Sequence, residues 1–164
     1  MDVLVVDDSG HMRTILKELL RSMGMTSIRE ASNAAEALAI LQEYTVDIAM
    51  IDISMPGMDG VNLARHIRND PNSSNPYLPI LVISGHANLQ AAQRARDAGV
   101  SEFLVKPITA RGLYDRILAI IDRPRAFVRV DNYFGPDRRR RNDNRYVGIE
   151  RRGRSSAHAL DVST

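Results

Sequence analysis

Apolar residues along the chain fall into short runs that alternate with stretches of helical periodicity. The runs are rich in Val, Ile and Leu and occupy residues 3–6, 46–51, 79–83 and 103–105, with a weaker one at 27–30. After each run, apolar residues recur every three or four positions, which predicts an amphipathic helix. These helical stretches cover residues 12–23, 33–41, 61–68, 89–98 and 109–121.

Signals for helix ends support these boundaries. Gly24 follows the first helical stretch, as a glycine at a helix C-terminus should. Asn33 with Glu36 three residues later has the spacing of a capping box, and Thr109 is a suitable N-cap. Five strands alternating with five helices predict an α/β fold. Its parallel sheet is covered on both faces, because parallel neighbours need crossover connections.

The alternation stops near Asp122, so we divide the chain into residues 1–122 and an arginine-rich tail, residues 123–164. The first segment has 11 Lys and Arg against 15 Asp and Glu, a net charge of −4. The tail has 11 Arg against 5 acids, a net charge of +6, so the overall charge of +2 hides two segments of opposite sign. Pro124 should end the last helix, and the alternating run at 127–130 predicts an edge strand.

Composition excludes several classes of protein. The chain has no cysteine, which excludes disulfides and thiolate metal sites. No apolar run approaches the roughly 18 residues that a membrane-spanning helix needs. The first residues, MDVLVVDD, place acids where a signal peptide needs positive charge. We therefore expect a cytoplasmic protein with no membrane segment.

Polar side chains stand at the ends of four predicted strands. They are Asp7 and Asp8 after the first, Asp52 after the third, Ser84 after the fourth and Lys106 after the fifth. Because ligands of parallel sheets bind beyond the carboxyl ends of the strands, these groups should meet in one crevice. Three carboxylates so close repel one another unless a cation lies between them. Oxygen ligands of high charge favour a hard cation, so we expect Mg²⁺.

The same groups suit phosphoryl transfer to an aspartate. Asp52 is the expected nucleophile, Asp7 and Asp8 would hold the metal, and Lys106 and Ser84 would contact phosphoryl oxygens. Taken singly, the Asp pair would be a solvated turn or cap, Ser84 a strand-end hydroxyl and Lys106 a surface charge. Their joint placement at one edge of the sheet favours a phosphoacceptor site over those readings.

Residues 1–122 resemble the receiver domains of two-component response regulators in four motifs: VLVVDDS, IDISMPGMDG, PILVISG and FLVKP. The resemblance implies a flavodoxin-like, doubly wound five-stranded parallel sheet of strand order 2-1-3-4-5. It also implies Mg²⁺ bound by Asp7, Asp8, Asp52 and the backbone carbonyl of Ser54.

The resemblance also assigns conformational and kinetic roles. Ser84 and Phe103 match the family's switch pair, and the peptide between Lys106 and Pro107 should be cis. Ser54 and His86 occupy two positions that vary widely in the family, beside the water that hydrolyses the acyl phosphate. They should tune the lifetime of the phosphorylated form.

The function implied is that of a stand-alone response regulator in a phosphorelay. Asp52 would receive its phosphoryl group from a histidine kinase or phosphotransfer protein, and the signal would pass to a downstream protein partner. The chain would be no enzyme beyond its own Mg²⁺-dependent phosphorylation and dephosphorylation. Two alternatives are a phosphotransfer intermediate or phosphate sink, and a nucleic-acid-binding regulator acting through the tail.

Mixed charges decorate the fourth and fifth helical stretches, residues 89–98 and 109–121. They come from Arg94, Arg96, Asp97, Arg111, Asp115 and Arg116. Such a face is usually only solvated. In this family it often mediates dimerisation or partner docking, so a homodimer through helices 4 and 5 is a further expectation.

The tail contains an internal near-repeat. Residues 133–139 read YFGPDRR, and thirteen residues later 146–152 read YVGIERR. The shared Tyr and Arg positions predict an apolar anchor with an anion-binding arginine pair: Tyr133, Arg138 and Arg139, then Tyr146, Arg151 and Arg152. The competing interpretation is a disordered tail. Nucleic acid is an unfavoured target because acids interrupt the basic face, and no companion motif supports a cyclic dinucleotide. A protein partner, or the chain's own acidic receiver, fits best.

Overall fold

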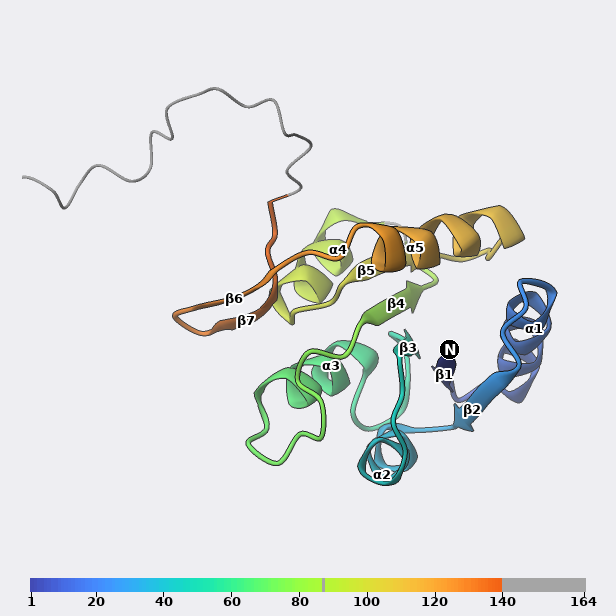
Figure 1. The fold of residues 1–164 in the computed structure, drawn as a ribbon, viewed down its shortest axis with the longest axis horizontal. Coiled ribbons are helices and arrows are strands. Elements are labelled where there is room, and N and C mark those ends of the chain that lie inside the picture. The colour runs from blue at the N-terminus through green and yellow to red at the C-terminus, as the bar shows by residue number, and fades with distance from the viewer. Residues whose placement is uncertain (87, 140–164) are drawn as a thin grey trace, which may run out of the picture.

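The computed structural model describes residues 1–86 and 88–139. Its main sheet has five parallel strands in the order β2-β1-β3-β4-β5 (Figure 1). The strands are β1 Asp2–Val6, β2 Ser27–Ala31, β3 Ile48–Asp52, β4 Ile80–Ser84 and β5 Glu102–Val105. The crossover helices are α1 Gly10–Ser22, α2 Ala34–Glu43, α3 Gly60–Asn69, α4 Leu89–Asp97 and α5 Ala110–Asp122.

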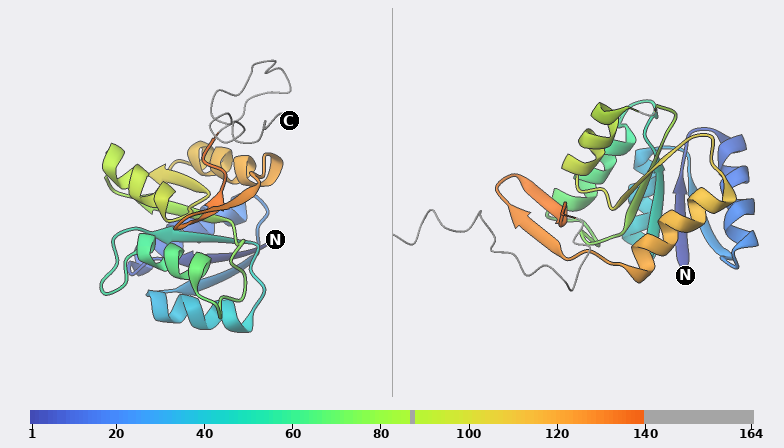
Figure 2. Two further views of the ribbon diagram at one scale, coloured as in Figure 1. Left: turned by 90° about the vertical axis from the view of Figure 1, so that its left-hand side faces the viewer. Right: turned by 90° about the horizontal axis from the view of Figure 1, so that it is seen from above.

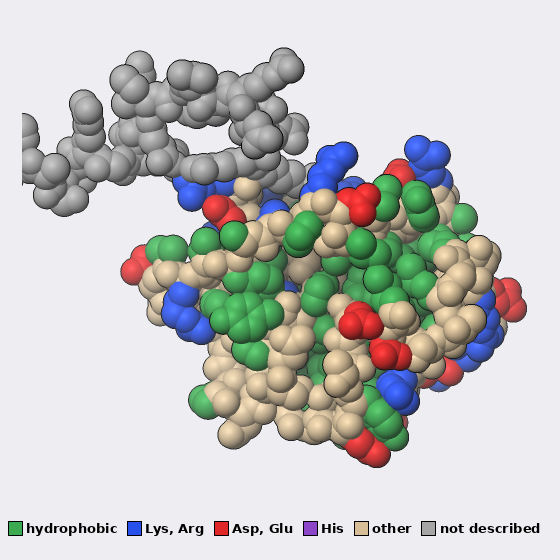
Figure 3. Space-filling model, in the orientation of Figure 1, with side chains coloured by type: hydrophobic (Ala, Val, Ile, Leu, Met, Phe, Trp, Pro, Cys, Tyr) green, Lys and Arg blue, Asp and Glu red, His purple; other side chains and the backbone are tan. Residues whose placement is uncertain are grey.

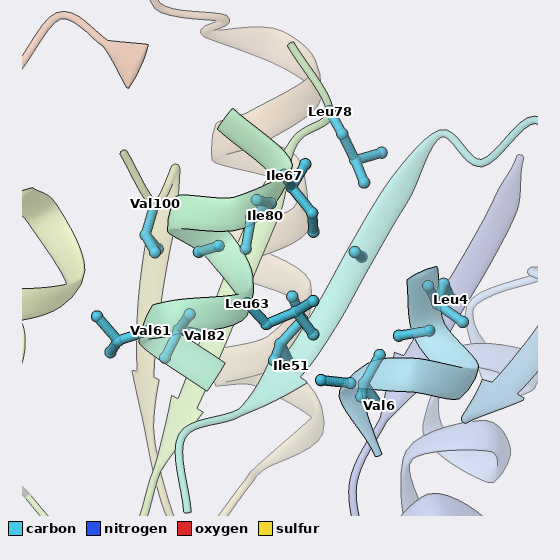
Figure 4. Close-up of a cluster of buried hydrophobic side chains, with 14 of the residues drawn as sticks. Leu4, Val6, Ile51, Val61, Leu63, Ile67, Leu78, Ile80, Val82 and Val100 are labelled. Carbon is cyan, nitrogen blue, oxygen red and sulfur yellow. The ribbon is translucent and has the colours of Figure 1, made fainter. Parts of the chain in front are cut away.

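Two hydrophobic cores lie on opposite faces of this sheet, because successive side chains of a strand point to opposite sides. In β1, Val3 and Val5 join α1 and α5 in one core, whereas Leu4 and Val6 join α2, α3 and α4 in the other. Figure 4 shows the second core, with Ile51 and Val82 of neighbouring strands directed toward Leu63 of α3. Strands buried on both faces explain the continuous apolar runs of the sequence.

Every one of these five helices begins at a polar cap. The side chains of Ser9, Asn33, Asp59, Asn88 and Thr109 each accept a hydrogen bond from a backbone N–H three residues on. The caps at Asn33 and Thr109 and the glycine ending at Gly24, whose φ is 87°, confirm the sequence prediction. The capping box differs in one detail, since Glu36 accepts from the N–H of Ser32 and not from that of Asn33.

A β-hairpin follows α5 and packs on the main domain. It pairs β6, Phe127–Val130, with β7, Tyr133–Pro136, in an antiparallel two-stranded sheet. The strand expected at 127–130 is thus present, but it does not join the five-stranded sheet. The hairpin lies between α3 and α4 (Figures 1 and 2).

Aromatic packing and close backbone contact hold the hairpin. The ring of Tyr77 lies 5.1 Å from that of Phe127 and 5.3 Å from that of Phe134, both edge-on. Gly99 and Gly135 touch through their backbones, and a Cβ on Gly135 would stand 2.6 Å from the Cα of Gly99. Figure 3 shows hydrophobic side chains exposed over this hairpin, with basic ones beside them.

Arg68 of α3 contacts both the hairpin and the main domain. Its buried guanidinium donates to the carbonyls of Gly99 and Pro76, both at 2.9 Å, and lies 4.9 Å from the ring centre of Phe127. Burial lowers the pKa of Arg68 to about 10, and it remains charged at neutral pH. The side chain therefore links α3, the loop before β4 and the hairpin.

The expected fold class, strand order and helix count are confirmed for the main domain. The first 17 residues of the tail, 123–139, are described and carry the hairpin. The second repeat unit, with Tyr146, Arg151 and Arg152, lies outside the described residues. No helix in the described part of the chain has the length and apolar character to cross a membrane.

We predict that Gly135→Ala lowers the free energy of unfolding by about 2 kcal/mol, because its methyl group overlaps Gly99. Urea unfolding would measure the change. Gly85→Ala is the control, since a Cβ there meets no atom within 4 Å and should leave stability nearly unchanged. Equal effects of the two substitutions would contradict close packing of the hairpin.

Candidate functional site

The polar residues predicted at the strand ends lie together at one edge of the sheet. β1, β3, β4 and β5 are consecutive neighbours and parallel, so their carboxyl ends open on the same side. Asp52 is the last residue of β3 and Ser84 the last of β4, while Asp7 and Lys106 directly follow β1 and β5.

Three carboxylates form the centre of the site. One oxygen from each of Asp7, Asp8 and Asp52 lies within 4.8 Å of the others. Asp7 and Asp52 are buried, with 2% and 4% of their surface exposed, while Asp8 faces solvent. Burial raises the pKa of Asp7, and the nearby Asp52 carboxylate adds to this, although the backbone N–H of Ser9 opposes it. The ionised form of Asp7 is therefore destabilised relative to the protonated form.

Lys106 supplies the positive charge of the site. Its Nζ lies 2.8 Å from Oδ1 of Asp52. That oxygen nevertheless accepts no well-aligned hydrogen bond within the described residues, so the contact is an ion pair without hydrogen-bond geometry. The lysine side chain is 28% exposed and reaches the buried carboxylate from the solvent side.

The site fits a hard divalent cation. Oδ2 of Asp7 and Oδ1 of Asp52 are buried without a hydrogen-bond partner in the described part of the chain. Unpartnered buried carboxylate oxygens are costly, and one lysine cannot neutralise three carboxylates. Asp7, Asp8 and Asp52 would hold such an ion, and an all-oxygen donor set suits Mg²⁺.

Ser84 is fully buried, and its hydroxyl is engaged locally. It donates to the carbonyl of His86 at 3.2 Å and accepts from the backbone N–H of His86 at 3.0 Å. Ser54 and His86 are exposed beside the crevice, and the metal role of the Ser54 carbonyl stays a prediction.

The other two expected switch positions lie on or just after β5. Phe103 is half-buried and packs against the core that faces α3 and α4. The Lys106–Pro107 peptide is cis, as the sequence resemblance implied.

Two supporting residues were not identified from the sequence. Gly60, the first residue of α3, packs on the Asp52 backbone so tightly that a Cβ would stand 2.2 Å from the Asp52 carbonyl oxygen. Arg13 of α1 donates to the Asp7 carbonyl at 2.7 Å and pairs with Glu30 of β2 at 3.2 Å. In the sequence, the role of Gly60 could have been predicted only from its place as the second glycine of the IDISMPGMDG motif.

Comparison with protein families gives one match over most of the domain. Residues 3–118 match the model described as "Response regulator receiver domain". Among relatives, the chemotaxis protein CheY of Pseudomonas aeruginosa is 38% identical over 123 residues, which cover 75% of this chain and 98% of that protein. CheY-3 of Vibrio cholerae is 37% identical over 123 residues, with 75% and 93% covered.

Solved structures show the same fold. Chemotaxis protein CheY4 of Vibrio cholerae superposes with a TM-score of 0.67 at 28% identity, covering 73% of this chain and 98% of that one. A response regulator receiver domain protein from Clostridium thermocellum gives a TM-score of 0.66 at 31% identity, covering 74% and 94%.

We predict that Asp7→Asn raises the free energy of unfolding in metal-free buffer by about 1 kcal/mol, because it removes a strained buried charge. The amide oxygen can still accept from Ser9. The same substitution should reduce the rise in melting temperature that Mg²⁺ causes, because a ligand is lost. Asp115→Asn, on the exposed face of α5, is the charge-matched control. Lower metal-free stability of Asp7→Asn would contradict the repulsion described here.

Proposed function

This chain belongs to the response regulator receiver family of two-component signalling proteins, and on that premise we propose that Asp52 is its phosphoacceptor. The phosphoryl donor would be a histidine kinase or a phosphotransfer protein. The observation that carries the proposal is the placement of the buried Asp52 carboxylate 2.8 Å from Lys106 and within 4.8 Å of two further carboxylates.

Asp52 is the nucleophile because it is the carboxylate at the centre of the arrangement. Its Oδ1 is buried and paired with a cation, while Asp7 is anchored through Ser9 and Arg13 and Asp8 faces solvent. A carboxylate oxygen of Asp52 would attack phosphorus as the bond from phosphorus to the donor nitrogen breaks. The imidazole leaves with the bonding electron pair, and the product is an acyl phosphate.

The remaining side chains would stabilise the transferred group. Lys106 is within reach of Asp52 and would neutralise a phosphoryl oxygen. The Ser84 hydroxyl would turn from the backbone of His86 to donate to a second oxygen, and Phe103, its expected switch partner, would turn inward. Mg²⁺ held by Asp7, Asp8 and Asp52 would supply further charge neutralisation when bound.

The output would be a change in protein binding. Residues 1–86 and 88–139 contain the receiver and its C-terminal hairpin, with no further domain in this described part. A receiver of this kind would signal by altering its own surface, and it would catalyse no reaction apart from its own phosphorylation and dephosphorylation.

We predict that Asp52→Asn abolishes labelling by radioactive acetyl phosphate with Mg²⁺, because the amide is not a nucleophile. Asp115→Asn should label like the native chain, since Asp115 lies on the exposed face of α5. Undiminished labelling of Asp52→Asn would overturn the site assignment.

We further predict that Lys106→Ala keeps part of the labelling but loses the phosphorylation-dependent response. Asp52 and the other carboxylates remain in place, whereas the ammonium group that would bind a phosphoryl oxygen is lost. Intrinsic fluorescence of the tyrosines or one-dimensional NMR would follow the response. A native response in Lys106→Ala would contradict the role of the lysine.

A further inference from the structure

Helix α4 is weakly anchored in its own domain. Of its nine residues, Ala95 is the one that is buried. Its remaining attachments include two exposed ion pairs. Near the phosphoacceptor site, Arg94 pairs with Asp59 at 3.4 Å, and at the helix end Asp97 pairs with Arg138 at 3.1 Å. The position of α4 therefore depends on both the site and the hairpin segment.

Arg138 follows β7, and its guanidinium is held in a position to bind a carboxylate. Its guanidinium lies 3.9 Å from the ring centre of Tyr133, whose hydroxyl in turn donates to the carbonyl of Pro136 at 2.7 Å. The stacked ring fixes the guanidinium, yet 41% of the arginine side chain and 56% of that of Asp97 stay exposed. An external carboxylate can thus reach Arg138 and compete with Asp97.

A hollow beside this pair offers room for such a ligand. It measures about 810 Å³ and is lined by Arg65 of α3, Asp97 of α4 and the hairpin side chains Val128, Val130 and Tyr133, with Arg138 at its side. The lining carries three arginines and three aspartates, so its charge is balanced, and a carboxylate is expected at Arg138, which already binds one from Asp97. The apolar side chains of Val128 and Val130 beside it suit a peptide whose acidic residues alternate with apolar ones.

We propose that the hairpin is the output surface of this receiver, where an acidic protein segment binds Arg138 in competition with Asp97 of α4. The proposal rests on the proposed function of Asp52. Because Asp97 belongs to α4, any movement of that helix changes how freely Arg138 can be reached. By reciprocity, a bound acidic segment would shift the same helix.

The phosphoacceptor site reaches α4 through contacts already described. Gly60 packs on the backbone of Asp52, the adjacent Asp59 caps α3, and Asp59 pairs with Arg94 of α4. On phosphorylation, the single negative charge of the Asp52 carboxylate would be replaced by the roughly 1.5–2 negative charges of the phosphoryl group, a net gain of at most about one. That change acts on the backbone and the ion pair through which α4 is attached.

Protein is favoured over nucleic acid as the partner. Asp131 and Asp137 line the hollow with Arg138. A continuous phosphate backbone would meet these acids at close spacing, whereas a peptide can place its carboxylates selectively. The ligand that Arg138 holds in this structure is itself a protein carboxylate.

Fluorescence anisotropy with a labelled peptide of alternating Glu and Leu residues tests the competition on the full chain. Asp97→Asn should tighten binding about two- to fivefold, the range that an exposed ion pair can contribute. Asp115→Asn removes the same charge from α5 and should have a smaller effect. Arg138→Gln should weaken binding and abolish the gain from Asp97→Asn. Equal effects of the two Asp substitutions would overturn the proposal, as would tighter binding of a DNA duplex with the same dependence on Asp97.

Repeating the titration after treatment with acetyl phosphate and Mg²⁺ tests the link to Asp52. Mass spectrometry of the same samples reports the phosphorylated fraction. We expect phosphorylation to change the peptide affinity about threefold or more, with no change in Asp52→Asn. An unphosphorylated native chain would refute the proposed function. A phosphorylated chain with unchanged affinity would refute the hairpin as output while leaving Asp52 as phosphoacceptor.

Discussion

Electrostatic repulsion among three carboxylates is the constraint on which this structure depends. The order of the strands places β1 beside β3, so the ends of both strands bring Asp7, Asp8 and Asp52 within 4.8 Å of one another. Lys106 offsets part of that charge through its ion pair with Oδ1 of Asp52, while Oδ2 of Asp7 is buried without a hydrogen-bond partner among the described residues. A site built this way stores unfavourable energy that a bound cation would relieve.

The sequence sufficed for the fold and the central residues because both follow from position along strands. Carboxyl ends of parallel strands converge whatever the details of packing, so Asp52, Ser84 and Lys106 could be grouped from spacing alone. The function of Gly60 could not be derived in the same way, because it depends on a backbone contact made after α3 has docked. The direction of the Ser84 hydroxyl likewise depends on the local path of the chain at His86.

The hairpin shows where prediction from the sequence reached its limit. Alternation at 127–130 indicated a strand and the repeat marked Tyr133 and Arg138, but neither pattern shows what they contact. The surface of the main domain on which the hairpin packs is formed by Arg68, Tyr77 and Gly99, which come from three other parts of the chain. In this structure the first repeat unit uses its arginines within the chain, with Arg138 on Asp97 and Arg139 on Asp137.

Weak attachments suit the response to phosphorylation that we propose for α4. Exposed ion pairs contribute at most about 1 kcal/mol each, whereas coupling between two sites is typically about 1–3 kcal/mol. The contacts of Arg94 with Asp59 and of Asp97 with Arg138 are thus weak enough for the phosphorylation proposed at Asp52 to overcome. Arg68, buried and bonded to two carbonyls, is by contrast too firmly held to switch. The hairpin therefore combines a fixed base on α3 with a labile contact to α4, so that movement of α4 changes the surroundings of Arg138 without dislodging the hairpin.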